Sequence, residues 1–114
     1  MDTDIFLDLS LILKKCIGDV QNPEGVFPIL AECFRFLRNA VIGSKQRQSF
    51  IREKTEIVPS CITFLKQRVK DFEESCPNED MLVATRCCLQ FISNFMVDNE
   101  DNSKLISTIA NDSM

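Results

Sequence analysis

The sequence predicts an all-α fold built from stacked helical repeats, and three observations predict it. The stretch Ala31–Ala40 (AECFRFLRNA) returns in similar form as Cys87–Phe95 (CCLQFISNF), a shift of 55 residues from Asn39 to Asn94. Self-similarity at a period of tens of residues is typical of stacked helical units. Three glycines and four prolines are too few for a loop-rich or all-β chain. Apolar residues recur at three- and four-residue steps, and long strand-like alternation is absent.

The first half of the chain contains three expected helices. Asp4–Ile17 carries an apolar stripe at helical spacing, and Gly18 is a suitable stop. The composition of residues 22–25 (NPEG) indicates a turn. The next helix, 27–42, tolerates Pro28 in its first turn and ends at Gly43. After a polar connection at 44–46, Arg47–Glu53 has the length of a helix of about two turns.

The second half repeats this plan. Thr55 can cap a helix that starts near Glu56 and ends at the break Ser75–Asn78. Asn78 can cap the fifth helix, Glu79–Val97, whose first turn is acidic, as the helix dipole favours. Residues 98–102 are expected to form a loop, and Ser103–Ala110 a last short helix.

The order of one short and two longer helices resembles the armadillo repeat, whose third helix ends in a leucine-rich segment with Asn before a small residue. Leu37–Ala40 fits that ending, and Ile92–Phe95 fits it with a bulky last residue. The resemblance implies one domain over residues 1–114, with about two and a half repeats in a short right-handed superhelix and a truncated C-terminal end. The alternative is a compact helical bundle that acts as a homotypic, death-fold-like adaptor. A bundle with one closed core has no reason to contain the 55-residue echo.

Three strings, Glu32–Ala40, Cys88–Asn94 and 99–103, are similar to the N-terminal repeat region of the ataxin-10 family. Members of that family are much longer and carry a C-terminal domain, so this chain resembles a fragment or a short relative. The resemblance implies a non-catalytic protein-interaction scaffold with roles in cell division (cytokinesis) and in neuronal survival and outgrowth.

Composition points away from catalysis and from cofactors. The chain has no His, which excludes Ser-His and Cys-His dyads and His-containing metal sites. The six cysteines form no C-x-x-C pair and are expected to be reduced structural thiols in a cytoplasmic protein. A thiol-dependent enzyme would need a cationic neighbour, for which Arg86 beside Cys87 is the candidate. A net charge of −4, without a basic cluster, does not favour nucleic acid, and no apolar run is long enough to span a membrane.

The candidate partner-binding groove follows the two helices that end in Asn. A four-residue step puts Arg35 on the face of Asn39, and Gln90 with Arg86 on the face of Asn94. By resemblance to armadillo proteins, this column lines a concave groove in which the Asn side chains bond an extended peptide. With Arg38, the arginines favour an acidic segment. The alternative is that each Asn only ties its helix end to a neighbouring loop. Basic import signals are not supported, since Arg35 and Gln90 occupy positions where import receptors place Trp.

A second surface is expected to support homo-oligomer formation. The last helix carries Leu105, Ile106 and Ile109, which together with Phe95 and Met96 would form an incompletely covered apolar patch.

Overall fold

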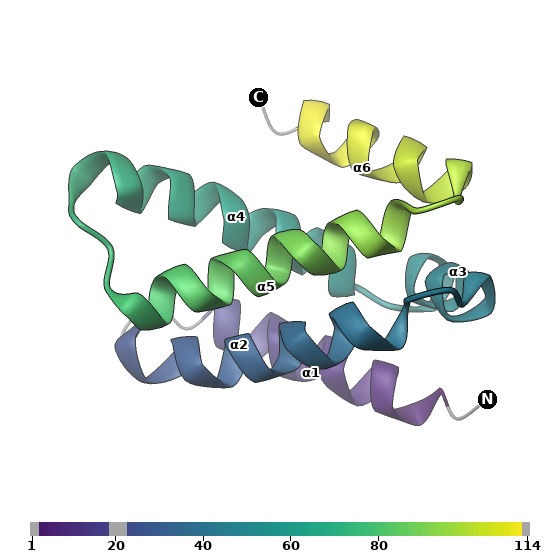
Figure 1. Cartoon of the computed structure of the whole chain (residues 1–114), viewed down its shortest axis with the longest axis horizontal. Helices are drawn as coiled ribbons and strands as arrows, with labels where there is room; N and C mark the ends of the chain where they lie inside the picture. The colour runs from purple at the N-terminus through teal and green to yellow at the C-terminus, as the bar shows by residue number, and fades with distance from the viewer. Residues whose placement is uncertain (1–2, 19–22, 113–114) are drawn as a thin grey trace.

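The computed structural model describes residues 3–18 and 23–112 and confirms the all-α prediction. The described residues form six α-helices and no strand (Figure 1). The helices are α1 (Asp4–Gly18), α2 (Pro23–Ala40), α3 (Lys45–Lys54), α4 (Ile57–Glu74), α5 (Glu79–Met96) and α6 (Glu100–Asp112).

Helices that are equivalent under the 55-residue shift pack against each other. α2 lies alongside α5, α1 contacts α4, and α3 contacts α6. In Figure 1, α2 and α5 run in the same direction, whereas α1 and α4 run back the opposite way. A stack of repeats places each helix beside its counterpart in the next unit. The single-domain boundaries, the repeat count and the right-handed superhelix stay predictions.

The connections after α2 and after α5 have the same backbone geometry. Gly43 has φ +64°, and Asp98, 55 positions later, has φ +52°. This left-handed conformation reverses the chain after a helix and is easily adopted by Gly. Asp occupies it more readily than most other residues with a side chain. The predicted stop at Gly43 is confirmed. The equivalent position is Asp98, so no glycine marks this second stop in the sequence.

The short helices that follow are capped at matching positions. The Ser44 hydroxyl oxygen accepts a hydrogen bond from Arg47 N at 3.3 Å. Asn99 Oδ1 accepts one from Asn102 N at 3.2 Å. Each cap satisfies a backbone donor that the first turn of a helix leaves without a partner. Because Asn99 is such a cap, α6 begins at Glu100, and the prediction of a loop through residue 102 was wrong.

The start of α2 also differs from the prediction. Asn22 lies outside the described residues, but Pro23–Gly25 are helical rather than a turn. Pro23 is the first residue of α2, a position at which proline costs nothing because the N–H it lacks would have no helical acceptor. Pro28 therefore lies inside the helix and not in its first turn.

The predicted cap at Asn78 is confirmed, because Asn78 Oδ1 accepts from Met81 N at 2.8 Å. The predicted cap at Thr55 was wrong in position: Glu56 is the N-cap of α4, and its side chain makes no cap bond. Thr55 Oγ1 instead accepts from Ile57 N at 3.2 Å.

A cluster of aromatic rings joins the two repeat units, α1–α3 and α4–α6. The ring of Phe64 on α4 lies 6.4 Å from that of Phe27 and 5.2 Å from that of Phe34, both on α2. The guanidinium of Arg68 lies over Phe27 and Phe64, with its carbon 4.8 and 4.9 Å from the ring centres. Burial lowers the pKa of Arg68, although the nearby Asp71 carboxylate acts in the opposite direction. Cation–π contact and the ion pair with Asp71, at 3.0 Å, offset part of the cost of burying this charge.

The paired left-handed residues give the first testable prediction. A Cβ added at Gly43 would meet no atom within 4 Å, so Gly43→Ala carries only the backbone cost of the left-handed conformation. We expect a loss of about 1–2 kcal/mol in the free energy of unfolding, measured by urea denaturation. Asp98→Gly should be neutral or stabilising by up to about 1 kcal/mol. Equal destabilisation by both changes would contradict the equivalence of the two connections.

Candidate protein-binding site

Four of the six predicted groove residues meet where α2 contacts α5. Arg38 Nη1 donates to Gln90 Oε1 at 2.7 Å, and Arg38 Nε donates to Asn39 Oδ1 at 3.2 Å. Asn94 Nδ2 donates to the Arg38 carbonyl oxygen at 3.1 Å. A surface pocket of about 360 Å³ opens here, lined by Arg38, Gln90, Ser93 and Asn94.

The remaining two predicted groove residues, Arg35 and Arg86, do not line this pocket. Arg35 forms an ion pair with Glu32 on its own helix, and the hydrogen bond and charge of Glu32 raise the pKa of Arg35. Arg86 is exposed on α5. Arg38, and not Arg35, is the residue that bonds Gln90. The bond between Arg38 and Gln90 joins positions that are not equivalent under the 55-residue shift. The assignment of Arg35 and Arg86 to the groove stays a prediction.

The two asparagines of the echo have different environments. Asn39 is exposed, and its side chain bonds only that of Arg38 among the described residues. Asn94 is half-buried and uses its amide N–H to hold the last turn of α2. Asn94 thus bonds a neighbouring helix and not the neighbouring loop of the alternative, whereas the Asn39 N–H₂ group has no acceptor among the described residues.

The thiols are arranged as structural residues. Cys61, Cys87 and Cys88 are buried, and Cys76 is exposed. Burial raises the pKa of Cys61, which lowers its thiolate fraction and hence its reactivity. The cation that interacts electrostatically with Cys87 is Arg35 of the neighbouring helix. The sequence had offered only Arg86 as that neighbour.

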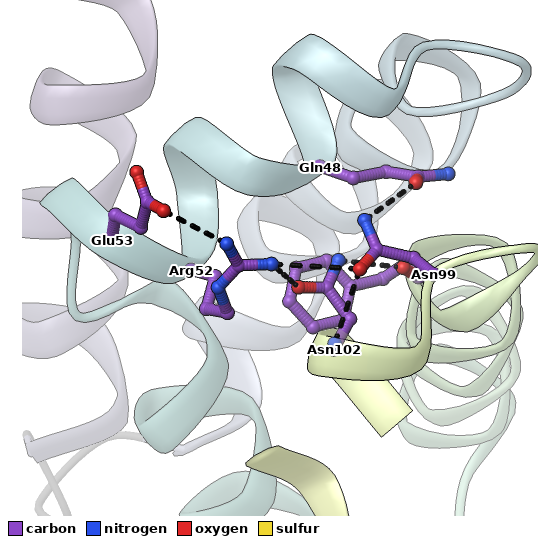
Figure 2. A network of polar contacts seen from close by, with 6 residues as sticks. Gln48, Arg52, Glu53, Asn99 and Asn102 are labelled. Atoms are coloured by element: carbon purple, nitrogen blue, oxygen red, sulfur yellow. Dashed lines mark hydrogen bonds and ion pairs between the residues drawn. The ribbon is translucent and has the colours of Figure 1, made fainter. Parts of the chain in front are cut away.

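A buried polar junction beside this surface was missed by the sequence analysis. We define it as Gln48 and Arg52 of α3 with Asn99 and Asn102 at the start of α6; Figure 2 shows these side chains converging. Gln48, Asn99 and Asn102 are all buried. Asn99 Nδ2 donates to Gln48 Oε1 at 3.1 Å, and Arg52 Nη1 donates to Asn102 Oδ1 at 2.7 Å (Figure 2).

The junction also binds the carboxyl ends of both long helices. Gln48 Nε2 donates to the carbonyl oxygens of Val41 at 3.1 Å and Asn94 at 3.0 Å. Asn102 Nδ2 donates to the carbonyl oxygen of Phe95 at 2.8 Å. The last carbonyls of a helix have no partner within the helix, and burying them without a donor is costly. The junction supplies these donors.

One contact of the junction has a counterpart in the first unit. Arg47 Nη1 donates to the Ala40 carbonyl oxygen at 3.1 Å, as Asn102 does to Phe95, and both positions are shifted by 55. The sequence echo runs through these residues, but Arg and Asn share no obvious pattern, so only the alignment of the helix starts could have pointed to them.

The second predicted surface is partly buried. The side chains of Leu105, Ile106 and Ile109 on α6 are half-buried and pack against the core. Phe95 is fully buried and cannot belong to an exposed patch. The expectation that Phe95 is left uncovered was wrong, because Phe95 belongs to the buried core and both α4 and α6 contact α5.

No group of three or more His, Cys, Asp and Glu side chains within residues 3–18 and 23–112 could hold a metal ion. The expectation of no cofactor stays a prediction. No helix in the described part of the chain is both long and apolar enough to cross a membrane.

The fold and the contacts define an all-helical protein in which equivalent helices of successive units stack. The comparisons give its family. The chain is 34% identical over 92 residues to ataxin-10 of Homo sapiens and to that of Pongo abelii, and 35% identical to that of Bos taurus. Each match covers 78% of this chain and 18% of the relative. The chain is therefore an ataxin-10 relative, and the family predicted from the short strings is confirmed.

The chain spans about a fifth of the length of these relatives. No protein-family model and no solved structure matches it.

The contrast between the two asparagines gives the second prediction. Asn94→Ala removes a donor from the Arg38 carbonyl and should lower the free energy of unfolding by about 1–3 kcal/mol. Asn39→Ala removes an exposed side chain and should change it by less than about 0.5 kcal/mol. Thermal and urea unfolding of the two single variants measure this directly. Equal effects would mean that both asparagines are structural or that neither is.

The third prediction concerns the polar junction. Asn102→Ala deletes the donor to Phe95 O and the acceptor of Arg52, both within a buried site. We expect a loss of about 1–3 kcal/mol or more, because an arginine loses its acceptor. Thr108→Ala, an exposed change on the same helix whose hydroxyl bonds only Lys104 O, is the matched control and should be near neutral. A junction that tolerated Asn102→Ala as well as Thr108→Ala would not hold the helices together.

Proposed function

We propose that this chain is a non-catalytic, armadillo-like protein-interaction scaffold that acts in the cytoplasm and binds an acidic, extended protein segment. The proposed groove follows the α2–α5 junction and comprises Arg35, Arg38, Asn39, Arg86, Gln90 and Asn94. The observation that carries the proposal is the pocket of about 360 Å³ between α2 and α5, with Arg38 and Gln90 in its wall.

The polar groups left available at this surface suit a peptide backbone. The Gln90 side-chain oxygen accepts a hydrogen bond from Arg38, so the Gln90 N–H₂ group remains available to donate. Asn39 likewise keeps its N–H₂ group, since its oxygen accepts from Arg38. Donors of this kind bond the carbonyls of an extended chain. The charges of Arg38 and Arg86 favour carboxylates along the bound segment, although the whole chain carries a net charge of −4.

Two features support a scaffold over the other classes of protein. The stacking of α1 on α4, α2 on α5 and α3 on α6 favours repeats over the compact, death-fold-like adaptor. Burial, the first cause of the raised pKa values of Cys33 and Cys61, disfavours these two thiols as nucleophiles. The relationship to ataxin-10 suggests that the chain acts in cell division and in neuronal survival and outgrowth, as the family resemblance implies.

The fourth prediction tests the groove. Fluorescence anisotropy is measured with two labelled peptides of equal length, one alternating Glu with Ser and the other alternating Lys with Ser. The acidic peptide should bind and the basic one should not. Arg86→Ala should weaken binding about two- to fivefold, the effect of one exposed charge. Because Arg86 is exposed, this change should leave the unfolding transition unchanged.

Lys70→Ala is the matched control, since it removes the same charge from an exposed site on α4. It should leave peptide binding unchanged. Equal weakening by Lys70→Ala and Arg86→Ala would show unspecific charge attraction, and absence of binding to the acidic peptide would refute the proposed partner chemistry.

A further inference from the structure

Two hollows follow one another along the line where α1 meets α4. These two helices contact each other and run in the same direction (Figure 1). The first hollow, of about 540 Å³, lies between Leu7 and Leu11 of α1 and residues 53–56 at the junction of α3 with α4. The second, of about 270 Å³, lies between Lys14 and Gly18 of α1 and residues 59–67 of α4. We call the two hollows together the α1–α4 seam.

The α1 side of the seam is a column of exposed residues at helical spacing. Leu7, Leu11, Lys14 and Gly18 follow each other at four-, three- and four-residue steps, and Leu7 is 42% and Leu11 70% exposed. The column extends over about 17 Å, or three helical turns. The furrow between two packed helices accepts the side chains of a third helix, and large apolar residues left exposed in a hollow mark an interface.

The polar groups of the first hollow are already bonded within the fold. Ser10 Oγ accepts from Glu56 N at 2.9 Å. Thr55 Oγ1 donates to the Ile51 carbonyl oxygen at 2.7 Å and accepts from Ile57 N at 3.2 Å. An extended peptide needs partners for its own N–H and C=O groups, whereas an α-helix satisfies these groups within itself. The hollow therefore suits a helical segment better than an extended one.

The two ends of the seam differ in charge. Around the first hollow, four carboxylates outnumber two cations: Asp4 and Asp8, one turn before the two leucines, and Glu53 and Glu56, against Arg52 and Lys54. Glu53 is paired with Arg52, but among the described residues Glu56 has no ion pair, and its side chain does not cap α4. At the second hollow the lining cation is Lys14, and no carboxylate of the described residues lines it.

This polarity sets the direction of a helix that docks here. A helix is stabilised by acidic residues in its first turn and by basic residues in its last turn. Such a helix matches the seam when its last turn lies beside Glu56 and its first turn beside Lys14. It then runs antiparallel to α1, and its dipole opposes those of α1 and α4, which is the favourable arrangement for neighbouring dipoles.

We propose that the α1–α4 seam binds a short amphipathic helix of another protein, antiparallel to α1. Two large apolar residues of that helix, one turn apart, pack on Leu7 and Leu11, while its basic last turn faces Glu56 and its acidic first turn faces Lys14. This proposal does not depend on the peptide-binding groove between α2 and α5, because the two surfaces share no residue.

Fluorescence anisotropy tests the seam and gives the fifth prediction. The labelled probe is a peptide of about three turns with glutamates in the first turn, two leucines one turn apart and lysines in the last turn; a lactam bridge on its outer side keeps it helical. The reference peptide has its glutamates and lysines exchanged. The chain should bind the probe at least about fivefold more tightly than the reference, the sum of several exposed charge contacts.

Variants of the seam should act in a defined way. Leu11→Asp places a charge in the apolar contact and should weaken probe binding at least about tenfold. The double change Lys14→Glu with Glu56→Lys should reverse the preference between the two peptides. Ile12→Asp is the matched control, since Ile12 is an exposed residue of α1 that lines neither hollow, and it should leave binding unchanged. Circular dichroism verifies that all variants fold.

Four outcomes overturn the proposal. They are a chain that binds neither peptide, equal binding of both peptides, and probe binding that Arg86→Ala abolishes but Leu11→Asp leaves intact, which would place the probe in the α2–α5 groove. The fourth is self-association in sedimentation velocity that Leu11→Asp abolishes, because the seam would then belong to a second copy of the chain.

Discussion

The structure depends on supplying hydrogen-bond donors to the buried carboxyl ends of its long helices. An α-helix leaves its last carbonyls without partners, and a stack of helices removes those carbonyls from water. Gln48 serves the ends of α2 and α5 with one amide, and Asn102 serves α5 with another. These donors lie on α3 and α6. The two short helices therefore fix the position and direction of α2 and α5 relative to each other, and the apolar side chains pack accordingly.

That constraint explains why the proposed groove offers fewer available amide groups than its two asparagines suggest. The Asn94 N–H₂ group donates to the Arg38 carbonyl oxygen at the carboxyl end of α2, so this group stabilises the fold. Among the described residues, the Asn39 N–H₂ group has no such acceptor, so its donors remain available. Residues that are equivalent in a repeat therefore divide into structural and available ones according to whether a neighbouring unit lies against them. The same rule separates buried Phe91 from exposed Phe36.

The chain is related to much longer proteins, the ataxin-10 proteins. The matched part of this chain covers 18% of the length of these relatives. Repeat proteins distribute their stability over nearest-neighbour interfaces, so a pair of units can fold while exposing faces that longer arrays bury.

The sequence by itself determined which segments are helical to within a few residues, the cap at Asn78 and the period, because these follow from local spacing and from side chains near their own backbone. The echo from Asn39 to Asn94 located equivalent helices, and short strings identified the family. Contacts between helices were decided only by the tertiary structure: Arg38 with Gln90, Gln48 with two helix ends, Arg35 beside Cys87. Such pairs depend on the axial offset and the faces at which helices meet, and no local pattern encodes either of them.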